Sequence, residues 1–89
     1  MTFQVRFEPE AARHYKKLDR TVQRKVDVAL PRLAADPRGP ATRALVGYPG
    51  VHRIKAGRDY RVIYLIEDGQ AVIVVIDVGH RRDIYRRLA

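Results

Sequence analysis

A dense group of basic and aromatic side chains follows the last glycine of the chain, in the segment GHRRDIYRR. Its members His80, Arg81, Arg82 and Tyr85 are residue types that bind phosphate, stack on a base or transfer a proton. The glycine permits a sharp exit from a preceding strand, and Tyr85 stands about one helical turn after Arg81 or Arg82. The segment is a surface helix, a nucleic-acid clamp or part of a metal-free nuclease site.

Three more cations lie in two strand-like segments, VHRIKA and DYRVIYLI. Because successive side chains of a strand point to opposite faces, an inward-facing Ile54 sends Arg53 and Lys55 to the other face. Arg61 stands inside an otherwise apolar strand, where a guanidinium needs a partner or a ligand. The partner could be structural, for example a salt bridge with Asp77. If the two strands are adjacent, the three cations and the arginines after the last glycine converge on one phosphate-binding surface.

Tyr85 has two interpretations. It stacks on an unpaired base while the neighbouring arginines hold the phosphates. Alternatively, it joins Ile84 and Leu88 in docking a C-terminal helix on the core. The sequence alone does not separate the two.

Other chemistries lack a supporting pattern. The three histidines, His14, His52 and His80, are scattered, and no pair of His, Asp or Glu residues has metal-ligand spacing. There is no phosphate-loop motif and no locally supported Ser/His/Asp arrangement. We therefore expect neither a metal nor a cofactor.

The composition favours a polyanionic partner. The 89 residues include 18 Lys and Arg against 10 Asp and Glu, giving a net charge of +8. Residues 1–89 are expected to form a single domain, for which 46% hydrophobic residues provide one core. The absence of cysteine, of a signal-peptide pattern and of a long apolar run predicts a cytoplasmic protein without a membrane segment.

The N-terminal third predicts one strand and two helices. TFQVRF at residues 2–7 alternates as a half-buried strand does, and helical spacing begins at Pro9. Asp19 is a candidate N-cap for a second helix, whose apolar stripe runs to Leu33. Pro31 lies inside that stripe and predicts a kink or an early end of the regular helix.

The remainder predicts three strands after a loop rich in proline and glycine at residues 35–50. The strands are 51–56, 59–66 and 70–78, the last two joined by an Asp-Gly hairpin signal. The expected fold class is α+β: a small twisted sheet, antiparallel or mixed, of about four strands with an N-terminal helical hairpin on one face. The order is strand, helix, helix and three strands, followed by a short C-terminal helix.

The layout and the segments VHRIKAGRDYRVIY and VGHRRDIYR together resemble the RelE/ParE superfamily of bacterial and archaeal type II toxins, most closely the RelE branch. The resemblance covers almost the whole chain. It implies a metal-independent endoribonuclease that enters the ribosomal A site and cuts mRNA. In such a reaction the ribose 2′-hydroxyl attacks the adjacent phosphate, and translation stops.

The resemblance also assigns roles to individual residues. The Lys-x-Lys pair of RelE reads Arg53-Ile54-Lys55 here, so one member is arginine. The phosphate-contacting arginine that follows the last glycine falls on Arg81, with Arg82 as the competing alignment. The implied catalytic residues are Lys55, Arg61, Arg81 and Tyr85, and the implied RNA-binding residues are Arg43, Arg53, His80 and Arg82.

Two alternatives remain beside the nuclease. A ParE-like toxin has the same fold and inhibits DNA gyrase without cutting RNA, and a basic binding module has no toxicity of its own. In every toxin interpretation the partner is a cognate antitoxin whose acidic or amphipathic segment covers the basic face. Operator DNA is then bound only by the toxin–antitoxin complex, and mRNA on the ribosome is the substrate of the nuclease.

Overall fold

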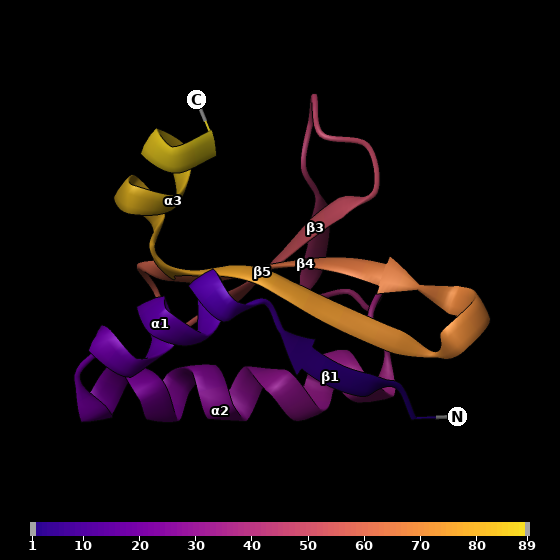
Figure 1. The fold of residues 1–89 in the computed structure, drawn as a ribbon, viewed down its shortest axis with the longest axis horizontal. Coiled ribbons are helices and arrows are strands. Elements are labelled where there is room, and N and C mark those ends of the chain that lie inside the picture. The colour runs from indigo at the N-terminus through magenta and orange to yellow at the C-terminus, as the bar shows by residue number, and fades with distance from the viewer. Residues whose placement is uncertain (1, 89) are drawn as a thin grey trace.

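The computed structural model describes residues 2–88, which form a five-stranded mixed sheet with helices on both sides (Figure 1). The elements in chain order are β1 (Gln4–Phe7), α1 (Pro9–Lys17), α2 (Arg20–Ala35), β2 (Thr42–Ala44), β3 (Val51–Ala56), β4 (Tyr60–Glu67), a 3-10 turn η1 (Asp68–Gln70), β5 (Val72–His80) and α3 (Arg81–Leu88). No helix within this part of the chain is long and apolar enough to cross a membrane.

The strand order is β1-β5-β4-β3-β2, with β1 parallel to β5 and every other neighbouring pair antiparallel. The predicted fold class is confirmed. The prediction of about four strands missed β2, which lies inside the segment predicted as a loop. Its three residues are too few to show a strand alternation in the sequence.

Helices α1 and α2 form the predicted hairpin, and each begins where the sequence predicted. Pro9 occupies the first turn of α1, and the Asp19 side chain caps α2 by accepting a hydrogen bond from the Val22 amide at 3.0 Å. The prediction that Pro31 ends the helix early was wrong, because α2 continues to Ala35. Leu33, beyond the proline, is fully buried, and its burial requires the helix to continue.

The core lies between this hairpin and one face of the sheet. Its buried cluster is Ala11, Val26, Ala29, Leu33, Ile54, Ala56, Val62, Tyr64, Ile73, Val75 and Val78. A β-bulge on β5 shifts the register between Ile63 and Tyr64, which allows both Val75 and Val78 to face the core although they are three residues apart. In Figure 1, α1 and α2 lie on one side of the sheet and α3 rises from the other.

Candidate functional site

Four basic side chains lie on the sheet face opposite the core. Residues paired directly across antiparallel strands point to the same face. Arg43 pairs with Arg53 across β2 and β3, and Lys55 pairs with Arg61 across β3 and β4. Within residues 2–88, none of the four forms an ion pair with a carboxylate. The structure therefore brings Arg53, Lys55 and Arg61 together as the strand alternation predicted.

Arg61 is the most deeply buried cation of this group, with 5% of its surface exposed. Its Nη1 donates to the carbonyl oxygens of Arg58 at 3.1 Å and Tyr60 at 3.0 Å, which fix the guanidinium against the β3–β4 turn. Its Nε is buried and has no hydrogen-bond partner among the described residues. A buried charge without a counter-ion is costly, so Arg61 is well placed to receive an anion.

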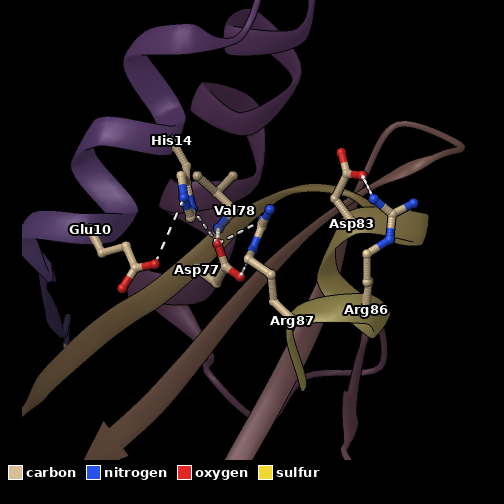
Figure 2. A network of polar contacts seen from close by, with 7 residues as sticks. All are labelled: Glu10, His14, Asp77, Val78, Asp83, Arg86 and Arg87. Atoms are coloured by element: carbon tan, nitrogen blue, oxygen red, sulfur yellow. Dashed lines mark hydrogen bonds and ion pairs between the residues drawn. The ribbon is translucent and has the colours of Figure 1, made fainter. Parts of the chain in front are cut away.

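The suggested salt bridge between Arg61 and Asp77 is wrong. The Asp77 carboxylate instead accepts hydrogen bonds from His14 Nδ1 at 2.8 Å and from Arg87 Nε at 2.8 Å (Figure 2). Burial opposes ionisation of Asp77, but the hydrogen bonds from Arg87 and His14 outweigh it and lower the pKa of the carboxyl. Asp77 therefore binds side chains of α1 and α3, and Arg61 has no carboxylate partner within residues 2–88.

Gly79 connects the strand beside that of Arg61 to the start of α3. Gly79 pairs with Arg61 across β4 and β5. A Cβ at Gly79 would lie 3.0 Å from Arg87 Nη2, the flexible end of a side chain, and 4.0 Å from Ile84 Cδ1, so a larger residue there would require Arg87 to shift. Gly79 was predicted to allow a sharp exit from the strand, and α3 begins only two residues later.

The structure distinguishes the residue that docks α3 from Tyr85, which is exposed. Ile84 is fully buried and docks α3, whereas Tyr85 is 47% exposed. Leu88 contributes its backbone carbonyl, which accepts a hydrogen bond from the Tyr48 hydroxyl in the β2–β3 connection. Tyr85 is therefore available to a ligand, and stacking on a base remains a prediction.

The residues before Tyr85 divide between two roles. Arg81 and Arg82 are exposed, and Arg81 shares a helical stripe with Tyr85 four residues later. His80 is paired with Tyr60 across β4 and β5, and the two rings meet edge to face at 5.3 Å. Its Nδ1 accepts a hydrogen bond from the Arg82 amide at 3.1 Å. His80 thus caps α3 from the core side of the sheet, and the structure does not bring it to the face of Arg61.

A polar cavity of about 440 Å³ extends the basic face at its outer edge. It is lined by Arg32, Pro40, Ala41, Arg43, Arg53, Ile54, Lys55 and Gly57. Sequence reasoning missed Arg32, which comes from α2. The only signal for it is its position next to Leu33, at the border of the apolar stripe. Arg43 is tethered by Nη1 to the carbonyl oxygens of Pro40 at 3.0 Å and Thr42 at 2.7 Å.

The sequence also matches a known family over nearly its full length. A family model described as "ParE toxin of type II toxin-antitoxin system, parDE" matches residues 5–85. The chain belongs to the RelE/ParE superfamily of type II toxins.

The relatives of this toxin include RelE-named proteins. The protein named "Toxin RelG" of Mycobacterium tuberculosis is 35% identical over 98% of this chain and 100% of its own length. The "mRNA interferase toxin RelE" of Escherichia coli K12 is 32% identical over 91% of this chain and 85% of its own.

Solved structures agree with these relatives. The toxin of the M. tuberculosis toxin–antitoxin complex RelBE2 superposes with a TM-score of 0.81 at 25% identity, covering 91% of this chain and 100% of that one. A mutant of the E. coli toxin RelE in the free state also gives 0.81, at 29% identity, covering 97% of this chain and 93% of that one.

Proposed function

We propose that this toxin is a ribosome-dependent endoribonuclease that cuts mRNA in the A site without a metal ion. Relatives about 32% identical are named mRNA interferases, which supports RNA cleavage for the family. The observation that carries the proposal is Arg61, a buried guanidinium with an unpartnered Nε and no carboxylate partner among the described residues, beside the cations of β3.

The basic face supplies what cleavage by the ribose 2′-hydroxyl requires. The 2′ oxygen attacks the adjacent phosphorus, the bond to the 5′ oxygen breaks, and a 2′,3′-cyclic phosphate and a 5′-hydroxyl result. Negative charge grows on the phosphate oxygens in the transition state, and fixed cations stabilise it. Arg61 and Arg81 hold those oxygens.

Proton transfer falls to Lys55 or Tyr85. One proton must leave the 2′-hydroxyl and one must reach the 5′ oxygen, so a general base and a general acid are needed. Lys55 pairs directly with Arg61, which places its ammonium among cations. Its amine therefore lies on the same face as the cation proposed to hold the phosphate, where it can reach the 2′-hydroxyl. Tyr85 stacks on the base or accepts this proton.

RNA is gripped by the remaining cations of the face. Arg53 and Arg43 line the cavity at the outer edge, together with Arg32 from α2. Arg82 continues the basic surface on α3. His80 contributes to RNA binding only indirectly, by capping the N-terminus of α3.

A second function is gyrase inhibition, favoured by one observation. The family model that matches residues 5–85 is that of ParE toxins. In this alternative the basic face binds a protein or DNA surface and cuts nothing.

A cognate antitoxin is the proposed protein partner in both cases. Solved structures similar to this chain include toxin–antitoxin complexes such as E. coli RelBE, at a TM-score of 0.77 and 30% identity. An acidic or amphipathic antitoxin segment would neutralise the basic face. Operator DNA would be bound by the complex alone.

The deciding experiment is a translation reaction containing purified toxin, ribosomes and a defined mRNA, read by primer extension. We expect cuts within the A-site codon only when ribosomes are present, and no cut when the scissile nucleotide carries a 2′-deoxy sugar. Intact mRNA, combined with gyrase-dependent DNA breaks in treated cells, would replace the nuclease with the gyrase inhibitor.

A further inference from the structure

The contacts that hold α3 to the rest of the molecule are few and differ in kind. Ile84 is fully buried, but apolar packing is non-directional and does not fix the rotation of a helix about its axis. The Arg81 amide donates to the Asp59 carbonyl at 2.7 Å, which anchors the first residue of α3 only. At the other end, the Leu88 carbonyl accepts a hydrogen bond from the Tyr48 hydroxyl in the β2–β3 connection. Arg87 makes the ion pair that ties this end to β5.

Arg87 reaches β5 through two hydrogen bonds to one carboxylate. Its Nε lies 2.8 Å from Asp77 Oδ2, and its Nη2 lies 3.0 Å from Asp77 Oδ1. A bidentate pair between a guanidinium and a carboxylate sets both distance and orientation. Arg87 passes over Gly79 on the way, since a Cβ there would lie 3.0 Å from its Nη2.

Two donors other than Arg87 also hold the Asp77 carboxylate in place. Its Oδ1 accepts hydrogen bonds from His14 Nδ1 at 2.8 Å and from the Val78 amide at 2.8 Å. His14 comes from α1, and its Nε2 lies 3.9 Å from the Glu10 carboxylate. Figure 2 shows Asp77 between His14 on one side and Arg87 on the other.

We propose that Asp77 is a positioning residue that fixes α3, and with it Tyr85, relative to Arg61 by joining Arg87 to His14. The effect of Asp77 on RNA cleavage rests on the proposed nuclease function, since Tyr85 and Arg61 belong to that site. Asp77 itself touches no substrate. Tyr85 lies in the chain between the buried Ile84 and the paired Arg87, so a change in either contact shifts the turn of α3 that carries it.

The test begins with amide hydrogen exchange in α3, measured residue by residue by NMR. In Asp77→Asn an amide donor replaces one carboxylate oxygen and faces Arg87 or His14. We expect the amides of Tyr85 to Leu88 to exchange about tenfold faster or more, as for loss of a charge-assisted hydrogen bond. Amides of β4 and β5 must keep their protection, which shows that the variant is folded.

A double-mutant cycle with Arg87→Gln tests whether the two residues act through each other. The double variant should be no worse than either single variant in α3 exchange and in turnover on ribosome-bound mRNA. Turnover of Asp77→Asn should fall about ten- to a hundredfold with little change in KM, because the reacting groups are misaligned while the RNA still binds.

Asp68→Asn is the matched control. Asp68 also accepts two hydrogen bonds from one arginine, Arg38, at 2.9 Å each, but at the turn before β5. This variant should leave α3 exchange and turnover unchanged.

Three results would overturn the positioning role: unchanged α3 exchange in Asp77→Asn, additive effects in the cycle, or faster α3 exchange with full turnover. If the wild-type toxin cuts no RNA, the nuclease proposal fails separately. The exchange measurements and their cycle still decide whether Asp77 holds α3.

Discussion

The floor of the candidate site and the helix that flanks it are built in opposite ways. Arg61, Lys55 and Arg53 project from paired strands whose backbone is held by a continuous hydrogen-bond ladder over the main core. Helix α3 has one fully buried residue, Ile84, and the bidentate ion pair of Arg87. A single hydrogen bond to the rest of the chain adds to these at each of its ends, at Arg81 and at Leu88. The three strand cations are therefore rigidly placed, whereas Tyr85 depends on a segment with few contacts.

Replacing Arg61 breaks the floor and gives the largest expected effect. Arg61→Ala should cost about 2.7–4 kcal/mol of transition-state stabilisation, or about 10²–10³ in turnover on ribosome-bound mRNA. Its melting temperature should change little, because the loss of the two hydrogen bonds from Nη1 is offset by removal of a buried charge that has no carboxylate partner within residues 2–88. Arg58→Ala, an exposed residue in the adjoining turn, serves as the control. Full toxicity of Arg61→Ala combined with Arg81→Ala would rule out the nuclease.

Truncating Ile84 tests whether α3 is the weaker region. A buried Ile→Ala substitution ordinarily costs about 2–5 kcal/mol. Because α3 can detach locally, we expect the global free energy of unfolding in urea to fall by less, while the α3 amides lose their protection. Equal loss of protection in α3 and in β4 would show that the two regions unfold as one unit.

Tyr85 variants separate stacking from proton transfer. Tyr85→Ala should weaken RNA cleavage by about 1–3 kcal/mol, the value of stacking one base on an aromatic ring, without changing the melting temperature of the toxin. Tyr85→Phe keeps the ring and removes the hydroxyl. If this variant cleaves RNA at a near-wild-type rate, Tyr85 stacks on the base and Lys55 accepts the proton. If it loses as much activity as the alanine variant, the Tyr85 hydroxyl takes part in proton transfer.

The contribution of Asp77 to stability should depend on pH. We expect this effect to be smaller than those of the Arg61, Ile84 and Tyr85 variants. Its carboxyl has a lowered pKa, since hydrogen bonds from Arg87 and His14 outweigh the opposing effect of burial. The stabilisation is therefore complete above the ordinary carboxyl value near pH 4 and is lost as the pH falls through the folded-state pKa. Urea denaturation should separate wild type from Asp77→Asn at pH 7, and the difference should shrink at pH 3.

Much of the fold could be predicted because its elements carry strong local patterns. Local properties of the sequence include Pro9 at the start of α1, the Asp19 cap and apolar stripe of α2, and the alternation in β3 and β4. The Asp68-Gly69 pair predicted the β4–β5 hairpin, although the observed turn is a 3-10 turn followed by Ala71 in a left-handed conformation. The early helix end predicted at Pro31 was wrong, because α2 continues to Ala35 and buries Leu33. Strand β2 was missed because its pairing with β3, and not its own three residues, defines it.

The candidate site divides in the same way. Strand alternation was enough to place Arg53, Lys55 and Arg61 on one face. The partners of Asp77 could not be predicted, because they depend on the bulge in β5 and on the angle at which α3 leaves the sheet. His80 was grouped with its arginine neighbours, but the parity of β5 places it on the opposite face from Arg61.

The parallel pairing of β1 with β5 has a consequence for synthesis. Gln4 to Phe7 pair with Val72 to Val75, so the first strand made must wait for the last one. At about 5–20 residues per second, this wait lasts about 3–13 s. During this time the hairpin of α1 and α2 lacks most of the sheet that it covers. The candidate site therefore cannot assemble on a nascent chain that has not yet reached Gly79, so nearly all of the chain is made before the site exists.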